Sequence, residues 1–314
     1  MLKTLTNGLA TVRLADFGAV RVQGADSRRF LQGQLSNDTE KLTGSASQLA
    51  GVHTPQGRAI AVLRLVAIGP DDVLAILPRE LAAPVAARLA KYVLRAKAKV
   101  TDASAEWDFF GLMTTSDAGA SAHPRLPTRL GEQVQLDASV VVCVDEATAR
   151  WLVAAPSGQA LAVDAGVNER ERWRALDIAA GIPQVYGATT EAFVAQMLNL
   201  DILGGIAFDK GCYTGQEVIA RAHYRGRVKR RMQRFRTLSS AKLSAGDSCR
   251  LRDGRSARVV DAVQLPDGRC EFLAVAPMIG AGAEETADAA ATPANDSAVV
   301  LDVEPLSLPY SLPA

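Results

Sequence analysis

The residues best suited to chemistry lie in the stretch 210–217, Lys-Gly-Cys-Tyr-Thr-Gly-Gln-Glu. Thr214 followed three residues later by Glu217, just ahead of an apolar pair, is typical of a capping box and predicts that a short helix starts there. Cys212 would then lie just before a helix N-terminus, where the helix dipole and the charge of Lys210 favour a thiolate. We therefore expect a thiol with a lowered pKa.

Gly211 and Gly215 flank this cysteine. Glycine accepts positive φ, so a tight turn here could present the sulfur of Cys212 to its surroundings. The alternative is a small apolar cysteine packed beneath the turn, because unreactive cysteines are among the most buried residues. Gln216 and Glu217 are expected to fix the start of the helix.

The segment 210–217, including Tyr213, resembles the signature of the YgfZ family, folate-dependent proteins that support iron–sulfur enzymes and are related to the glycine-cleavage T-protein. The similarity covers most of the chain and is sharpest from 168 to 231. Other segments agree with the family pattern: Phe30–Leu35, Asn37–Asp38, Gly57–Arg58, Ala180–Pro183, Asn199–Asp201, Leu203–Phe208 and Ala222–Arg230.

This resemblance implies an α+β protein with a T-protein-like folate-binding fold of ferredoxin-like subdomains around a central cavity, plus a C-terminal β-barrel-like domain. Its cofactor would be tetrahydrofolate or a one-carbon derivative. Cys212 would be the working thiol, as a nucleophile, a redox group or a contact to a partner. Lys210 would activate it and, with Asn199 and Arg221, bind the folate. Such a protein supports assembly or repair of iron–sulfur enzymes, including tRNA-modifying ones; its partners are client enzymes or cluster-assembly proteins.

A second possibility is a folate-dependent one-carbon transferase. In the T-protein a glutamate holds the pterin ring, and this sequence has Ala179 at the corresponding place. Buried pterin donors without a carboxylate would cost on the order of a few kcal/mol. The segment Pro78–Glu80 also lacks the Asn-Ala and downstream Asp pattern that the T-protein uses. The sequence therefore argues against glycine-cleavage aminomethyl transfer.

A third possibility is an RNA-binding module that uses a cluster of basic residues. Eight cations fall within sixteen residues with no acid among them: Arg221, Arg225, Arg227, Lys229, Arg230, Arg231, Arg234 and Arg236. They suit either RNA phosphates or folate carboxylates, or they are solvated. The two aromatic residues of this run, Tyr224 and Phe235, are isolated and form no stacking pattern, so the sequence does not favour nucleic acid.

Composition sets the remaining bounds. The 314 residues have a net charge of +1, 48% apolar and 22% charged residues, which is ordinary for a globular protein of about two domains. No apolar run predicts a signal or a membrane span, so we expect a cytoplasmic protein without a membrane partner. The four cysteines and three histidines are too scattered for a metal site.

Periodicity predicts the elements that position these residues. We expect a folate-binding α+β region over 1–228 and a β-barrel-like domain over 229–314, with a mobile loop near 280–297. Strands are expected at 19–23, 59–68, 73–77, 99–101, 109–114, 140–144, 151–155 and 299–303, and helices after Asp26, at 80–97 and after Asn168. Cys143 and Trp173 should be core residues, and Cys249 and Cys270 should lie on neighbouring strands without a disulfide.

Overall fold

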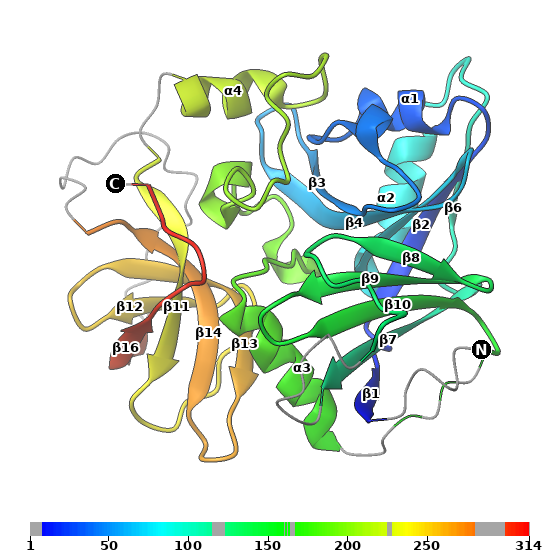
Figure 1. The fold of residues 1–314 in the computed structure, drawn as a ribbon. Coiled ribbons are helices and arrows are strands. Elements are labelled where there is room, and N and C mark those ends of the chain that lie inside the picture. The colour runs from blue at the N-terminus through cyan, green and yellow to red at the C-terminus, as the bar shows by residue number, and fades with distance from the viewer. Residues whose placement is uncertain are drawn as a thin grey trace. The chain divides into compact units, whose positions relative to one another are not determined.

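The computed structural model describes residues 8–114, 123–159, 161, 163, 167–224, 228–279 and 299–313 (Figure 1). The chain forms two compact units, each assembled from separate stretches of sequence. Unit 1 contains Met1–Val52, Ala61–Trp173 and Gly204–Thr214, and unit 2 contains His53–Ile60, Arg174–Leu203 and Gly215–Ala314. The motif at 210–217 is divided between them after Thr214.

The first sheet of unit 1 has the strand order β3-β4-β5-β2-β6. Its strands are β2 (Phe17–Gln23), β3 (Gln48–His53), β4 (Ala59–Gly69), β5 (Asp72–Pro78) and β6 (Lys99–Asp102). Helix α2 (Arg79–Ala90) buries Leu81, Val85 and Leu89 at a spacing of four residues and packs against β2 and β6. The helix α1 (Ser27–Gln32) and the 3-10 turn η2 (Thr39–Lys41) lie in the long connection from β2 to β3.

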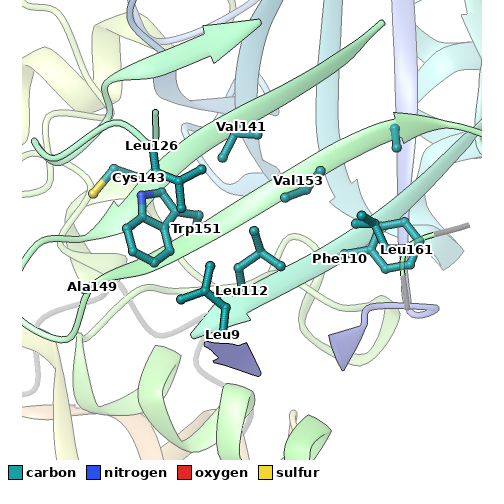
Figure 2. Close-up of a cluster of buried hydrophobic side chains, with 11 residues drawn as sticks. Leu9, Phe110, Leu112, Leu126, Val141, Cys143, Ala149, Trp151, Val153 and Leu161 are labelled. Atoms are coloured by element: carbon teal, nitrogen blue, oxygen red, sulfur yellow. The ribbon is translucent and has the colours of Figure 1, made fainter. Parts of the chain in front are cut away.

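The second sheet of unit 1 is antiparallel, with the order β1-β7-β10-β9-β8. Its strands are β1 (Leu9–Arg13), β7 (Trp107–Thr114), β8 (Gln133–Leu136), β9 (Ser139–Asp145) and β10 (Arg150–Pro156). Figure 2 shows the core on one face of this sheet, where Trp151 is fully buried among aliphatic side chains and its indole N–H donates to the Pro127 carbonyl over 2.7 Å. Cys143 lies in this cluster, as predicted, and burial raises the pKa of its thiol to about 11.

Helix α3 (Val167–Ala179) begins in unit 1 and ends in unit 2. Trp173, on the unit 1 side, is buried as expected, and its ring lies against the backbone of Gly111 in β7. A Cβ atom at Gly111 would lie 2.3 Å from that ring, so only glycine leaves room for it. The tryptophan is therefore a packing residue.

Unit 2 contains a six-stranded sheet in the order β15-β12-β13-β14-β11-β16. The strands are β11 (Arg230–Thr237), β12 (Ser248–Leu251), β13 (Ser256–Gln264), β14 (Cys270–Pro277), β15 (Val299–Leu301) and β16 (Val303–Leu306). The consecutive strands β15 and β16 pair at opposite edges, so the sheet is nearly closed. Its core includes Phe235 and Phe272, whose rings stack 5.6 Å apart. The expected barrel-like C-terminal part is confirmed.

The remaining regular elements of unit 2 are short. They are the 3-10 turns η4 (Gly187–Thr189) and η5 (Ala195–Leu198) and the helix α4 (Gln216–Tyr224). The described residues include no helix with the length and apolarity needed to cross a bilayer.

The structure corrects three expectations. The helix expected over 80–97 ends at Ala90, and the chain continues through turns to β6. Cys249 and Cys270 do not lie on neighbouring strands, because β13 separates β12 from β14; both are free, buried thiols. Strands β1, β3 and β8 were not expected. The loop predicted near 280–297 lies outside the described residues, and the domain boundary at 228/229 stays a prediction.

Candidate functional site

Cys212 is the exposed cysteine of this chain. All four cysteines are described and free, and the other three are buried. Burial raises the pKa of Cys249 to about 11 and raises that of Cys270, which keeps both protonated. A thiolate acts as the nucleophile in cysteine chemistry, so the buried thiols are inert. The turn at 210–214 therefore exposes the Cys212 sulfur and does not bury it in the core.

Lys210 is fixed by the end of α1 and the chain segment that follows it. Its ammonium donates three hydrogen bonds to backbone carbonyl oxygens, to Gln32 over 2.8 Å, to Leu35 over 2.7 Å and to Asn37 over 2.8 Å. An ammonium has three N–H donors, so all of them are used. Its nitrogen also lies 5.0 Å from the centre of the Tyr213 ring. Direct contact between Lys210 and a ligand would require one of these bonds to break.

Further hydrogen bonds join the same two stretches of unit 1. The Ser36 hydroxyl donates to the Gly205 carbonyl over 2.6 Å, and the Asn37 side chain donates to the Gly204 carbonyl over 2.8 Å. The Ala207 amide donates back to the Ser36 carbonyl over 3.0 Å. The segment leading to Cys212 is therefore held along its length by residues about 170 positions earlier in the chain.

Tyr213 and Gly211 have different surroundings although both adjoin the cysteine. Tyr213 is buried, and burial raises the pKa of its phenol to about 12. Gly211 is exposed, has no positive φ and would meet no atom within 4 Å if it carried a Cβ. The prediction that Gly211 supplies a positive φ to the turn is therefore wrong. The buried ring of Tyr213 therefore anchors the turn, while Gly211 and Cys212 are exposed.

In unit 2, the start of α4 depends on Gly215. Its φ is +86°, as expected for a tight turn, and a Cβ there would lie 2.5 Å from the Thr54 carbonyl oxygen and 3.1 Å from Gly57 Cα. Ile219 is the buried side chain of α4, and its carbonyl accepts a hydrogen bond from the Gln196 amide over 2.6 Å. These contacts fix the helix start against the 53–57 turn.

The predicted helix is confirmed, but its first residue is Gln216, and this side chain is half-buried. Glu217 points to solvent and pairs with Arg221 one turn later over 3.1 Å. This i,i+4 pair replaces the reciprocal Thr214–Glu217 capping expected from the sequence. Arg221 is 72% exposed, so its guanidinium is accessible to a ligand.

Asn199 lies in the interior of unit 2. It has a left-handed backbone with φ 58°, and its side-chain amide donates to the Met232 carbonyl over 2.9 Å. Its amide oxygen accepts from Arg231, which also forms a two-pronged ion pair with Asp201 at 2.9 and 2.8 Å. Because Asn199 is fully buried, its amide holds the chain around η5 to strand β11.

The arginine cluster predicted as a candidate anion site is largely neutralised. Besides Arg231, two arginines of β11 pair with acids far away in the sequence: Arg234 with Glu271, and Arg236 with Glu271 and Glu304. Arg230 donates to the Ser256 carbonyl, and burial lowers its pKa. Arg225 and Arg227 lie outside the described residues. Among the described members, Arg221, Lys229 and Arg230 are the three without a distant acidic partner.

Ala179 is the last residue of α3 and brings no polar side chain to this part of unit 2. The turn after it has Gly181 at φ +65°, where the Tyr310 hydroxyl donates to the Gly181 carbonyl over 2.8 Å. Burial raises the pKa of Tyr310 to about 12. Sequence reasoning missed Tyr310 and Ser36 and matched Asn37 to the family without predicting its contacts, because the partners of all three are distant in the chain. The described residues hold no cluster of three metal-ligating side chains.

The architecture has a known counterpart among solved structures. The structure matches aminomethyltransferase T of the glycine cleavage system from Bartonella henselae with a TM-score of 0.66 over 86% of this chain and 78% of that one, at 14% identity. The fold is therefore the T-protein fold, a mixed α/β arrangement that includes a barrel-like sheet. The expected fold class is confirmed.

Sequence comparison gives the family. The chain is 31% identical over 316 residues to "tRNA-modifying protein YgfZ" of Shigella boydii serotype 4, covering 97% of this chain and 94% of the relative. It is 32% identical over 273 residues to the protein of that name from Escherichia coli O157:H7, covering 83% of each. This chain belongs to the YgfZ family, as the motif at 210–217 predicted. A scan against protein-family models gives no match.

Proposed function

We propose that this chain is a tetrahydrofolate-binding accessory protein that supports the assembly or repair of iron–sulfur enzymes, including tRNA-modifying ones. The family and the T-protein fold support this proposal, as does the name tRNA-modifying protein carried by its relatives. The observation that carries it is the presentation of Cys212, an exposed thiol on a turn that Lys210 fixes through three hydrogen bonds. Such a turn suits a thiol that acts on a partner or a small molecule.

Cys212 is the working group of the proposal. An exposed sulfur can attack a one-carbon adduct, reduce a sulfur species or contact a client enzyme. Lys210 acts as the residue that fixes the position of the thiol, because its ammonium is bonded to backbone oxygens and its charge lies two residues before the sulfur. The buried ring of Tyr213 holds the other side of the turn.

The residues fit a folate at its carboxylate end. Arg221 offers a planar guanidinium that suits the glutamate carboxylates of a folate. Its present partner Glu217 is 84% exposed, and such surface pairs contribute about 0–1 kcal/mol, so a ligand carboxylate can replace it at little cost. Asn199 contributes by holding η5 and β11 together. A one-carbon derivative of tetrahydrofolate, when bound, would supply a one-carbon unit.

The pterin end fits less well. Ala179 offers no carboxylate for the ring N–H donors, so a pterin here would rely on backbone oxygens or bind more weakly than in the T-protein. No observation favours the one-carbon transferase. An accessory protein that binds a folate without rapid turnover accommodates this difference.

Calorimetric titration with a panel of reduced folates tests the ligand. Wild type should bind tetrahydrofolate or a one-carbon derivative, and Arg221→Ala should weaken binding by about tenfold, the effect of losing one charge-assisted contact. Arg250→Ala removes an exposed arginine from β12 and serves as the matched control; it should bind as wild type does.

Two further variants sharpen the test. Glu217→Gln frees Arg221 from its acidic neighbour and should bind at least as tightly as wild type. Lys210→Ala should lose binding together with thermal stability, because it loosens the turn. Unchanged folate binding in both Arg221→Ala and Lys210→Ala would remove these residues from the site, and absence of binding to wild type would remove the folate from the proposal.

A further inference from the structure

The segment that joins α2 to β6 in unit 1, Lys91–Lys99, is a second basic region (Figure 1). It carries four cations and no acid: Lys91, Arg95, Lys97 and Lys99. All four side chains are exposed. Two large apolar residues between them are exposed as well, Tyr92 to 49% and Leu94 to 86%. We refer to these six residues as the lysine segment.

The cations of the lysine segment have no acidic partners within the described part of the chain. Asp26 is the acid joined to this segment by hydrogen bonds, and it accepts the backbone amide of Lys97 over 2.7 Å rather than the ammonium. Positive charge is therefore left uncompensated in a chain whose net charge is +1. An uncompensated local patch attracts anions to that surface.

The backbone of the lysine segment is held in place. The Tyr92 amide donates to the Leu89 carbonyl over 3.0 Å, and the Lys97 carbonyl accepts from the Asp26 amide over 3.2 Å. Gly24 has a φ of +123°, and a Cβ there would lie 2.1 Å from the Lys97 carbonyl oxygen. The backbone between β2 and α1 therefore packs tightly against the backbone of Lys97. A ligand would meet a preformed surface and would lose little affinity to ordering it.

Structural roles explain only part of this surface. Lys91 lies next to the carboxyl end of α2, where a cation stabilises the helix dipole. Lys99 begins β6, an edge strand on which a charged residue prevents further strand pairing. Neither role requires Arg95 and Lys97 or an exposed tyrosine and leucine between the charges.

We propose that the lysine segment is an RNA-contact surface on which the cations bind phosphates and Tyr92 stacks on an unpaired base. Cations that alternate with an accessible aromatic ring are typical of surfaces that bind single strands and loops. A membrane surface fits less well, because lipid binding needs a broader apolar face than Tyr92 and Leu94 supply. The relatives named tRNA-modifying proteins make a structured RNA with exposed loops the fitting partner.

This surface differs from the arginine run 221–236 of unit 2. Arg231, Arg234 and Arg236 are ion-paired with acids, so they are not free to neutralise phosphates. The inference also goes beyond the proposed folate function, since it involves neither Arg221 nor Cys212. RNA binding and folate binding can therefore fail independently in an experiment.

The test is the salt dependence of binding to an unmodified tRNA transcript, measured by fluorescence anisotropy between 50 and 200 mM KCl. Each phosphate contact contributes a slope of about −0.7 to −0.9 in log K against log salt, so four contacts give about −3. Lys97→Gln/Lys99→Gln should reduce the slope by about 1.5 and the affinity at 100 mM salt by about tenfold. Lys242→Gln/Arg250→Gln removes two exposed cations from unit 2 and should leave both unchanged.

Tyr92→Leu separates stacking from simple apolar contact. It should weaken tRNA binding by about fivefold, because base stacking on an aromatic ring is lost while apolar surface remains. All variants should bind tetrahydrofolate as wild type does. The proposal is overturned if wild type does not bind tRNA, if Lys97→Gln/Lys99→Gln and the control pair behave alike, or if wild type binds phosphatidylglycerol vesicles and not tRNA.

Discussion

Strand β11 and the lysine segment are both runs of cations in the sequence, yet they have opposite surroundings in the structure. Three of the four arginines of β11 pair with acids of unit 2, among them Arg231 with Asp201 and Arg234 with Glu271. The cations of Lys91–Lys99 are exposed and have no acidic partner in the described part of unit 1. Charge density along a sequence therefore does not show which cations are available to a ligand.

The largest loss of stability should come from breaking the buried Arg231–Asp201 pair. Arg231→Met leaves the Asp201 carboxylate without its partner and removes the donor to the Asn199 amide oxygen. Removing one member of a buried ion pair costs about 3–5 kcal/mol. Urea unfolding should show a loss of this size; a loss under about 1 kcal/mol would mean that the pair is solvated.

The same contrast holds between two lysines. Lys210→Met leaves the carbonyls of Gln32, Leu35 and Asn37 without a donor, which should lower the free energy of unfolding by about 2 kcal/mol. Lys97→Met makes the same chemical change at an exposed site and is the matched control, with an expected change under about 0.5 kcal/mol. Equal losses in urea unfolding would contradict the difference between the two sites.

The loss of unfolding free energy caused by Lys210→Met should also depend on pH. Burial lowers the pKa of this lysine from its ordinary 10.5 to about 8, opposed by the nearby Asp38 and Glu40 carboxylates. Between about pH 8 and 10.5 the unfolded chain keeps a proton that the folded chain has lost, so this group's contribution to stability rises with pH. The gap in unfolding free energy between wild type and Lys210→Met should widen from pH 7 to pH 10. A constant gap would show that the ammonium is not buried in solution.

A smaller loss is expected at the centre of the β11 network. Glu271→Gln weakens the ion pairs with Arg234 and Arg236. The side chains of these arginines are 18% and 29% exposed, so water can solvate their charges when the carboxylate is lost. We expect a loss of about 1–2 kcal/mol by thermal or urea unfolding. The expected order is Arg231→Met first and Glu271→Gln second; the reverse order would mean that burial does not govern these pairs.

The smallest stability effect should occur in the lysine segment itself. Lys97→Gln/Lys99→Gln removes two exposed charges and should change the free energy of unfolding by less than about 0.5 kcal/mol. A larger loss would assign these lysines a structural role and weaken their use as a contact surface. Circular dichroism melting of this variant is also the folding control for the RNA experiment.

Local pattern predicted much of the fold. The apolar run around Cys143 and the apolar helix face that includes Trp173 correctly indicated core residues, and the motif after Thr214 correctly indicated a helix. The end of α2 was predicted too late because the residues after Ala90 have good helix propensity, although the chain must turn there to place β6 beside β2. Propensity is a weak guide where tertiary packing decides.

The site was predictable only in part, because its determinants are not local. The motif identified Cys212, but the carbonyls that hold Lys210 lie more than 170 residues earlier in the chain. Asn199 is in a family-like segment, and the sequence could not show that its amide is buried against β11. The partners of the arginine run depend on the strand order of the sheet, which also separates Cys249 from Cys270.

The exposed thiol of Cys212 is the group on which the proposed function depends most. The direct measurement is the activity of an iron–sulfur tRNA-modifying enzyme in cells that lack this protein and express either wild type or Cys212→Ser, with Cys143→Ala as a control that removes a buried thiol. We predict that wild type and Cys143→Ala restore the activity and that folded Cys212→Ser does not. Full restoration by Cys212→Ser would contradict the account.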